Sequence, residues 1–184
     1  MYPLTPIVTL VFTVRPPYKW LLLGPPRSGT PFHVDPLATS AWNACLEGRK
    51  RWALYPPGGW DGEGDAWLPP GVKLTRMEDG ERSYDAPSSY EWWLTTYPSL
   101  DVRERPLEFI QEAGDVVFVP RGWWHTVVNE TYMVAYTQNF TSEHNFEDTL
   151  SVLKTSDRDL AEVFRCRGTD VATVRAPPAT RAAR

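Results

Sequence analysis

The sequence is poor in cysteine and has no long apolar run. Only two cysteines, Cys45 and Cys166, occur among 184 residues, too few for a disulfide framework and without the spacing of a zinc finger. We therefore expect two reduced thiols in an intracellular protein. The apolar stretch Met1–Val14 is shorter than the roughly 18–20 residues of a membrane-spanning helix, and it lacks the basic start and cleavage site of a signal peptide. These absences predict no membrane partner.

An excess of basic residues is also missing. The 19 basic and 23 acidic residues give a net charge of −4 and a pI near 5.4, which argues against direct nucleic-acid binding through a basic face. A hydrophobic content of 42% is enough for a folded core, and 184 residues are enough for one domain. Eighteen prolines disfavour long helices, so an all-helical fold is not expected.

Short β-strands separated by turns are predicted through most of the chain, because β-branched and aromatic segments are bounded by glycine, proline or asparagine. Turn signals at residues 47–49 and 112–115 predict that the strands on either side of each turn form hairpins. The predicted strands are Val8–Val14, Trp20–Leu23, Pro31–Val34, Ala41–Leu46, Arg51–Tyr55, Leu107–Gln111, Val116–Val119, Thr126–Val128 and Met133–Asn139.

Helices are predicted only near the C-terminus, at Phe146–Lys154 and Asp157–Phe164, with Ser156 or Asp157 as the cap of the second. Residues 169–184 are predicted to be a disordered tail, because they show no periodicity. Short strands followed by helices favour a β-sandwich or barrel with a C-terminal helical segment.

Residues 58–91 differ from their surroundings in composition. They contain eight acidic and three basic residues and many glycines, so little regular structure is predicted there. Such a segment is either a solvated insertion between strands or an acidic rim that attracts a basic peptide.

A metal site is suggested by the few histidines present, which are His33, His125 and His144. His33 and Asp35 are two residues apart, so on an extended strand their side chains lie on one face. Two histidines and one carboxylate form the facial triad of non-haem Fe(II) oxygenases, and His125 would complete it. Alternatively, these histidines are ordinary core residues. His144 has no place in the triad and is expected at the surface or as a helix cap.

Four motifs, in this order, make the pattern specific. They are GPPRSGTPFHVDPLATSAWN (24–43), GRKRWALYPP (48–57), GDVVFVPRGWWH (114–125) and TQNF (137–140). Together they closely resemble the Jumonji-C (JmjC) family of 2-oxoglutarate oxygenases, and within it the nuclear branch once called phosphatidylserine receptor, described as lysyl hydroxylases and arginine demethylases. The resemblance runs from Arg15 to Asn145, with gaps in residues 58–91.

The resemblance implies a mainly β fold, the double-stranded β-helix (a cupin-like jelly roll). The barrel would span residues 15–145 with an acidic insertion at 58–91, preceded by a residual strand at 1–14 and followed by helices at 146–168. The implied Fe(II) ligands are His33, Asp35 and His125. The implied 2-oxoglutarate residues are Thr30, Asn43, Lys50, Thr137 and Asn139.

The implied 2-oxoglutarate residues suit a dicarboxylate, because its burial in an apolar barrel requires a cation and hydrogen-bond donors. Lys50 would be the cation. Alternatively, Lys50 lies on the surface of a strand edge, and Thr137 and Asn139 only support the sheet.

The implied activity is that of a dioxygenase that uses Fe(II), 2-oxoglutarate and O₂, with ascorbate as reductant. It would hydroxylate lysine, or demethylate methyl-arginine, in basic proteins such as histones or RNA-processing factors, in the nucleus and also in the cytoplasm.

Three alternatives remain: a non-catalytic peptide-binding scaffold with the same fold, a truncated inactive fragment, and a cupin enzyme without cosubstrate. The fragment is considered because the family has a long region before the first motif, which contributes a pocket tyrosine. Missing strands would leave sheet edges and core exposed.

Overall fold

The computed structural model describes residues 18–59, 61–62, 67–76 and 82–171. The chain divides into two compact units, one formed by residues 17–140 and the other containing residues 141–184. Each unit is described by itself. The strand predicted at Val8–Val14 lies outside the described residues, as do the terminal residues 172–184 of the predicted tail.

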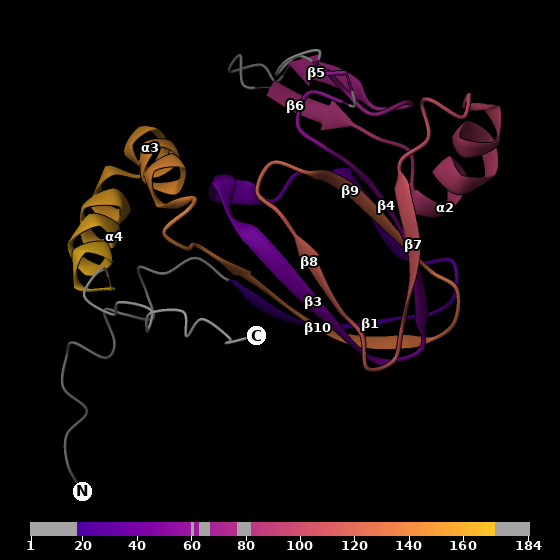
Figure 1. The fold of residues 1–184 in the computed structure, drawn as a ribbon, viewed down its shortest axis with the longest axis horizontal. Helices are drawn as coiled ribbons and strands as arrows, with labels where there is room; N and C mark the ends of the chain where they lie inside the picture. Colours follow the sequence, from indigo (N-terminus) through magenta and orange to yellow (C-terminus); the bar gives the residue numbers. More distant parts are fainter. Residues whose placement is uncertain (1–17, 60, 63–66, 77–81, 172–184) are drawn as a thin grey trace, which may run out of the picture. The chain divides into compact units, whose positions relative to one another are not determined.

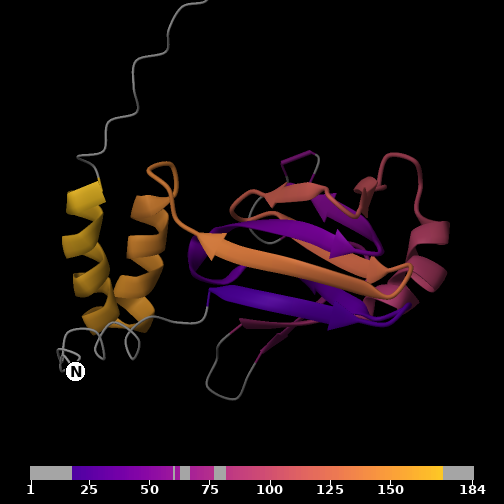
Figure 2. The same ribbon diagram turned by 90° about the horizontal axis from the view of Figure 1, so that it is seen from below.

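Eight strands of the first unit form two antiparallel four-stranded sheets (Figures 1 and 2). Strands that follow one another in sequence are distributed between the two sheets, which is the pattern of a double-stranded β-helix, so the predicted fold class is confirmed. The first sheet has the order β1 (Lys19–Gly24), β10 (Met133–Phe140), β3 (Ser40–Glu47) and β8 (Val116–Val119). The second has the order β2 (Gly29–His33), β9 (Trp124–Asn129), β4 (Arg49–Tyr55) and β7 (Leu107–Glu112).

The two predicted hairpins are wrong. The turn at Gly48 links β3 to β4, and the turn at Gly114 links β7 to β8, but in each case the two strands belong to different sheets. Both glycines have a positive φ, 88° and 98°, as a tight reversal requires. The turns were identified correctly, but each one carries the chain across the barrel because the hydrogen-bonding partners of β3 and β4 come from distant strands.

Eight strands of the barrel lie between Lys19 and Phe140, and the expectation that strands of the region before the first motif are missing stays a prediction. The outer face of the β1-containing sheet nevertheless exposes apolar side chains on both edge strands. Leu21 and Leu23 of β1 are 59% and 60% exposed, and Phe118 of β8 is 56% exposed. The two edge strands of this sheet thus present an apolar outer surface.

The segment between β4 and β7 (residues 56–106) contains regular structure that the sequence analysis did not predict. It includes a two-stranded sheet of β5 (Lys73–Arg76) and β6 (Arg82–Asp85), and three short helices: α2 (Ser89–Glu91), η2 (Trp92–Thr96) and η3 (Tyr97–Ser99). The Ser88 side chain caps α2 by accepting a hydrogen bond from Glu91 N. The prediction of little regular structure in residues 58–91 is therefore wrong, as is the prediction that helices occur only near the C-terminus. The prediction relied on the glycine and proline content and did not take into account the aromatic residues that pack this segment on the sheet.

Two hydrophobic cores lie on either side of the β2-containing sheet. Inside the barrel, Trp52 and Leu54 of β4 pack with Val127 of β9. Outside it, Trp92 of η2 is fully buried against Phe32 of β2, with an edge-to-face contact of 4.9 Å between ring centroids. Figure 1 shows β5, β6 and α2 outside the barrel, beside the sheet that contains β4, β7 and β9. The central strands of this sheet thus have a hydrophobic core on each face.

The second unit contains α3 (Phe146–Ser156) and α4 (Arg158–Val171), which pack together with the rings of Phe146 and Phe164 stacked 4.9 Å apart. The Asp157 carboxylate accepts a hydrogen bond from Leu160 N at 2.9 Å, so the alternative cap Asp157 is confirmed. Because α4 continues to Val171, the prediction of a tail from residue 169 is wrong for its first three residues. Among the described residues, no helix has the length and apolar character needed to cross a bilayer.

The outer core makes a test of the fold possible. Trp92→Ala removes a fully buried ring and its hydrogen bond to Pro70 O, so we expect the free energy of unfolding to fall by about 3–5 kcal/mol. Leu94→Ala, at a position of the same helix that is 58% exposed, should change it by roughly 0.5 kcal/mol or less. Denaturant unfolding of both variants measures the difference, and equal effects would contradict the outer core.

Candidate metal centre

The three predicted metal ligands come together at one end of the barrel. His33 ends β2 and lies directly opposite His125 of β9, with ring centroids 4.1 Å apart. Asp35 follows two residues after β2. One ligating atom from each side chain lies within 4.8 Å of those of the other two, which is close enough for all three to bind one ion.

Backbone carbonyls fix the orientation of both imidazole rings. His33 Nδ1 is 2.9 Å from Pro31 O, and His125 Nδ1 is 3.1 Å from Trp123 O. Because a carbonyl oxygen only accepts hydrogen bonds, each Nδ1 carries the proton, which leaves each Nε2 with its lone pair free for a metal.

The electrostatics of the site also fit a divalent cation. Burial, together with the neighbouring His33, lowers the pKa of His125 to about 3, so its imidazole is neutral at physiological pH. Burial raises the pKa of Asp35, although a hydrogen bond with Asn139 and the proximity of His33 act in the opposite direction. The Oδ2 atom of Asp35 is buried and has no hydrogen-bond partner. A bound cation would satisfy this oxygen and lower the pKa of the carboxyl group.

Lys50 lies inside the barrel rather than on the sheet surface. Its side chain is 2% exposed, and Nζ donates a hydrogen bond to Asn43 Oδ1 at 2.9 Å. Nζ also lies 5.2 Å from the ring centroid of Trp52. Burial lowers the pKa of Lys50 to about 8. No carboxylate is bonded to this ammonium among the described residues, so an anionic ligand would stabilise its charged form.

Three other predicted cosubstrate residues lie on β10 and β2. Thr137 is opposite Asn43 in the β10–β3 pairing, and its hydroxyl donates to Trp42 O at 2.9 Å. Asn139 Nδ2 donates to Thr39 Oγ1 at 3.0 Å. Asn139 also forms a hydrogen bond with Asp35, and the assignment of Thr137 and Asn139 to the cosubstrate stays a prediction. Thr30 is exposed on the edge strand β2.

Two buried polar residues near Lys50 were missed in the sequence. Gln111 lies opposite Lys50 on β7, accepts a hydrogen bond from Trp52 Nε1 at 2.9 Å and donates one to Asn43 O at 2.8 Å. Asn129 lies opposite Lys50 on β9 with its Oδ1 buried and unpaired. Polar residues at inward positions of apolar strands were the available signal, because a buried amide needs partners.

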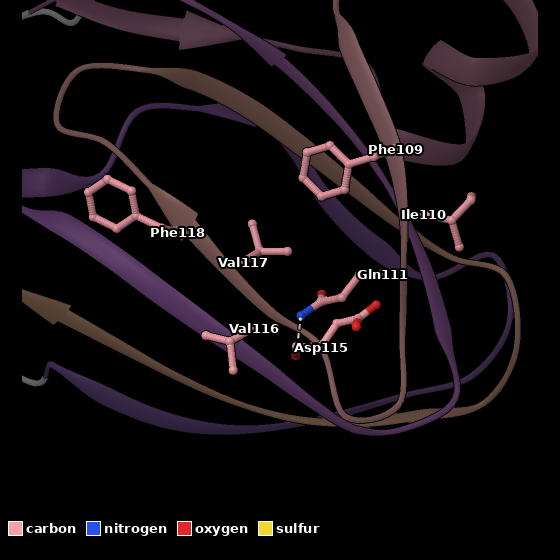
Figure 3. A pocket seen from close by; sticks show the side chains of 7 residues that line it. All are labelled: Phe109, Ile110, Gln111, Asp115, Val116, Val117 and Phe118. Carbon is pink, nitrogen blue, oxygen red and sulfur yellow. Dashed lines mark hydrogen bonds between the residues drawn. The ribbon is translucent and has the colours of Figure 1, made fainter. Parts of the chain in front are cut away.

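A cavity of about 340 Å³ opens between β7 and β8 (Figure 3). None of the metal-binding residues lines it, so it is distinct from the metal centre. Gln111 belongs to its wall and also contacts Asn43, so this side chain connects the cavity with the surroundings of Lys50. The residues that line the cavity are Phe109, Ile110, Gln111, Asp115, Val116, Val117 and Phe118.

Two histidines and one carboxylate at the end of a double-stranded β-helix define a class of protein, that of the non-haem iron oxygenases. The family model described as "JmjC domain, hydroxylase" matches residues 20–140. The chain therefore belongs to the JmjC-domain family, and the family predicted from the four motifs is confirmed.

Relatives with curated names support the same family. The chain is 50% identical over 133 residues to the lysine-specific demethylase JMJ21 of Arabidopsis thaliana, and the aligned region covers 72% of this chain and 13% of that protein. It is 40% identical over 136 residues to the bifunctional arginine demethylase and lysyl-hydroxylase psr-1 of Caenorhabditis elegans, covering 71% and 31%. It is 34% identical over 130 residues to the 2-oxoglutarate and iron-dependent oxygenase JMJD4 of Danio rerio, covering 71% and 28%. The chain thus spans less than a third of the length of each of these relatives.

The role of Asp35 can be tested by removing its charge. Asp35→Asn should weaken Mn(II) binding by more than the roughly 10–100-fold that the loss of an outer partner costs, because it replaces a charged ligand with a neutral one. The free energy of unfolding of the metal-free protein should not fall, since the raised pKa of Asp35 means that its buried charge opposes folding. Titration with Mn(II) and denaturant unfolding measure the two quantities. Asp101→Asn, at an exposed position, is the control, and equal Mn(II) affinity in both variants would contradict the assignment of Asp35.

Proposed function

We propose that this chain is the catalytic domain of an Fe(II)- and 2-oxoglutarate-dependent oxygenase that acts on a protein side chain. The main support is the coexistence of two features in one barrel: the group His33, Asp35 and His125, and the buried ammonium of Lys50. The first suits Fe(II) with open coordination positions, and the second suits a carboxylate of 2-oxoglutarate. Ascorbate would serve as reductant.

Each residue has a separate task in this proposal. His33, Asp35 and His125 would hold the iron, with both rings oriented by their Nδ1–carbonyl hydrogen bonds. Lys50 would bind the distal carboxylate of 2-oxoglutarate, oriented by Asn43. The iron, with 2-oxoglutarate and O₂, supplies the oxidation of a substrate C–H bond, while the apolar wall around Trp52 and Val127 excludes water from it.

The proposed substrate is lysine, or methyl-arginine, in a basic protein. The names of JMJ21 and psr-1 refer to lysine and arginine residues, and the chain carries the acidic segment 58–91. Of its acidic residues, Asp61, Asp85 and Glu91 are described, and all three are exposed. Such charges would steer a basic peptide towards the barrel. A nuclear location remains part of this proposal.

The alternatives have less support. A peptide-binding scaffold needs neither an assembled triad nor two imidazoles with free Nε2 atoms. A cupin enzyme without cosubstrate has no use for the buried ammonium of Lys50, whose lowered pKa shows that its burial is costly in the absence of an anion. Release of succinate from 2-oxoglutarate in the presence of Fe(II) and ascorbate, stimulated by a lysine- or arginine-rich peptide, distinguishes the enzyme from all three alternatives.

Removal of the Lys50 ammonium should separate cosubstrate binding from metal binding. Lys50→Ala would leave a carboxylate buried without its partner, at a cost of roughly 3–5 kcal/mol, so the 2-oxoglutarate requirement should rise by two or more orders of magnitude while Mn(II) affinity is retained. Arg49→Ala, which removes an exposed cation from the neighbouring position of β4, should leave both unchanged. Succinate release and Mn(II) titration measure the two effects. An unchanged 2-oxoglutarate requirement in Lys50→Ala would favour the scaffold.

The pH dependence of 2-oxoglutarate binding follows from the pKa of Lys50. Because this pKa is lowered to about 8, the free protein loses the lysine proton above that pH, and only the charged form attracts a carboxylate. Affinity should therefore decrease above pH 8, approaching about tenfold per pH unit. Calorimetric titrations between pH 7 and pH 9.5 measure the slope. In Lys50→Arg the cation remains charged, so the same slope in this variant would rule out Lys50 as its origin.

A further inference from the structure

A β-bulge in β2 brings the two metal-binding histidines together. Thr30 lies opposite Val127, but three residues later His33 lies opposite His125, so two residues of β2 face one residue of β9. In an unbroken register His33 would lie opposite Trp124, which packs in the outer core. A shift of one residue moves a side chain to the other face of a sheet. The bulge is therefore what places His33 inside the barrel.

The bulge interrupts the regular backbone hydrogen bonds between β2 and β9. Pro31 is one of the two bulged residues. It has no N–H group and cannot donate a backbone hydrogen bond to β9. The Thr126 hydroxyl, directly facing the bulge, hydrogen-bonds Thr30 O at 2.8 Å. A side-chain hydroxyl of β9 thus supplies a bond to the bulged strand.

The inserted segment contacts the same point through a second hydroxyl. Ser89 Oγ of α2 is 3.0 Å from Thr126 Oγ1, and the two side chains are 3% and 0% exposed. The Thr126 hydroxyl is the donor towards both Thr30 O and Ser89 Oγ, so its single proton is shared between these two acceptors. The other bulge residue, Phe32, packs against Trp92, three residues after Ser89. The inserted segment therefore holds both the hydroxyl and the aromatic side of the bulge.

We propose that Ser89 and Thr126 are positioning residues for the metal centre, through which the inserted segment sets the separation of His33 and His125. This inference rests on the proposed function, because it concerns binding of the catalytic metal. Neither residue contacts the metal ligands' imidazole nitrogens; their effect is on the register of β2 against β9. The inserted segment is then part of the catalytic apparatus as well as a cover for the sheet.

The test is a titration of the full chain with Mn(II), in which the electron paramagnetic resonance signal of free Mn(II) measures binding. Thr126→Val keeps the side-chain shape but removes both hydrogen bonds, so the dissociation constant should rise roughly 10–100-fold. Ser89→Ala removes one bond and should give a smaller increase, and Thr126→Ser should restore binding. Thr149→Val removes a buried hydroxyl from α3, in the other unit, and should bind Mn(II) like the parent.

Two further measurements separate positioning from general stability. The titrations are done well below the unfolding temperature of each variant, so a purely structural role would lower that temperature and leave the dissociation constant unchanged. Visible absorption of bound Co(II) should change in Thr126→Val, because its bands report ligand geometry. Parental Mn(II) affinity in both Thr126→Val and Ser89→Ala would overturn the inference alone. Failure of the parent chain to bind Mn(II) would overturn the proposed function together with the inference.

Discussion

The antiparallel pairing of β2 with β9 is the constraint on which the metal centre depends. His33 and His125 are far apart in the chain, and only this pairing places their rings 4.1 Å apart. It holds because β9 lies at the centre of its sheet, between β2 and β4, and is buried along its whole length. An edge strand that carries one ligand is thus anchored to a central strand that carries another. Rigid sheet elements fix ligand geometry more closely than loops do.

Burial shifts the pKa values of the ionisable groups in the barrel and makes their charged forms unfavourable. Desolvation keeps His125 neutral, raises the pKa of Asp35 and lowers that of Lys50. Each shift disfavours the charged form of a group in the free protein. A divalent cation at Asp35 and a dicarboxylate at Lys50 would oppose these shifts. Ligands of opposite charge would therefore stabilise the charged forms of both residues.

The inserted segment between β4 and β7 stabilises the sheet from outside. Arg51 of β4 lies 3.9 Å from the ring centroid of Trp93 and forms an ion pair with Glu108 of β7. Trp92 fills the outer core against Phe32. The sheet that carries His33 and His125 is therefore packed between the barrel interior and this segment, and a change in either layer affects the same strands.

The residue types of the site and most of the strands follow from local sequence patterns. The spacing of His33 and Asp35 suggested a metal site, and the resemblance of four motifs to the JmjC family implied the other roles, including that of Lys50. The predicted strands of the barrel all correspond to observed ones, since alternation of apolar residues reports which local segments lie half-buried.

Strand pairing, in contrast, depends on contacts between distant parts of the chain. The local pattern at Gly48 and Gly114 predicts hairpins, because it does not reveal that the partner of each strand comes from a distant part of the chain. The helices around Trp92 escaped prediction for the same reason, since their stability comes from packing on the sheet rather than from their own propensity. The bulge opposite Thr126 exists only in the paired strands, so register, and with it the metal geometry, is a property of the whole fold.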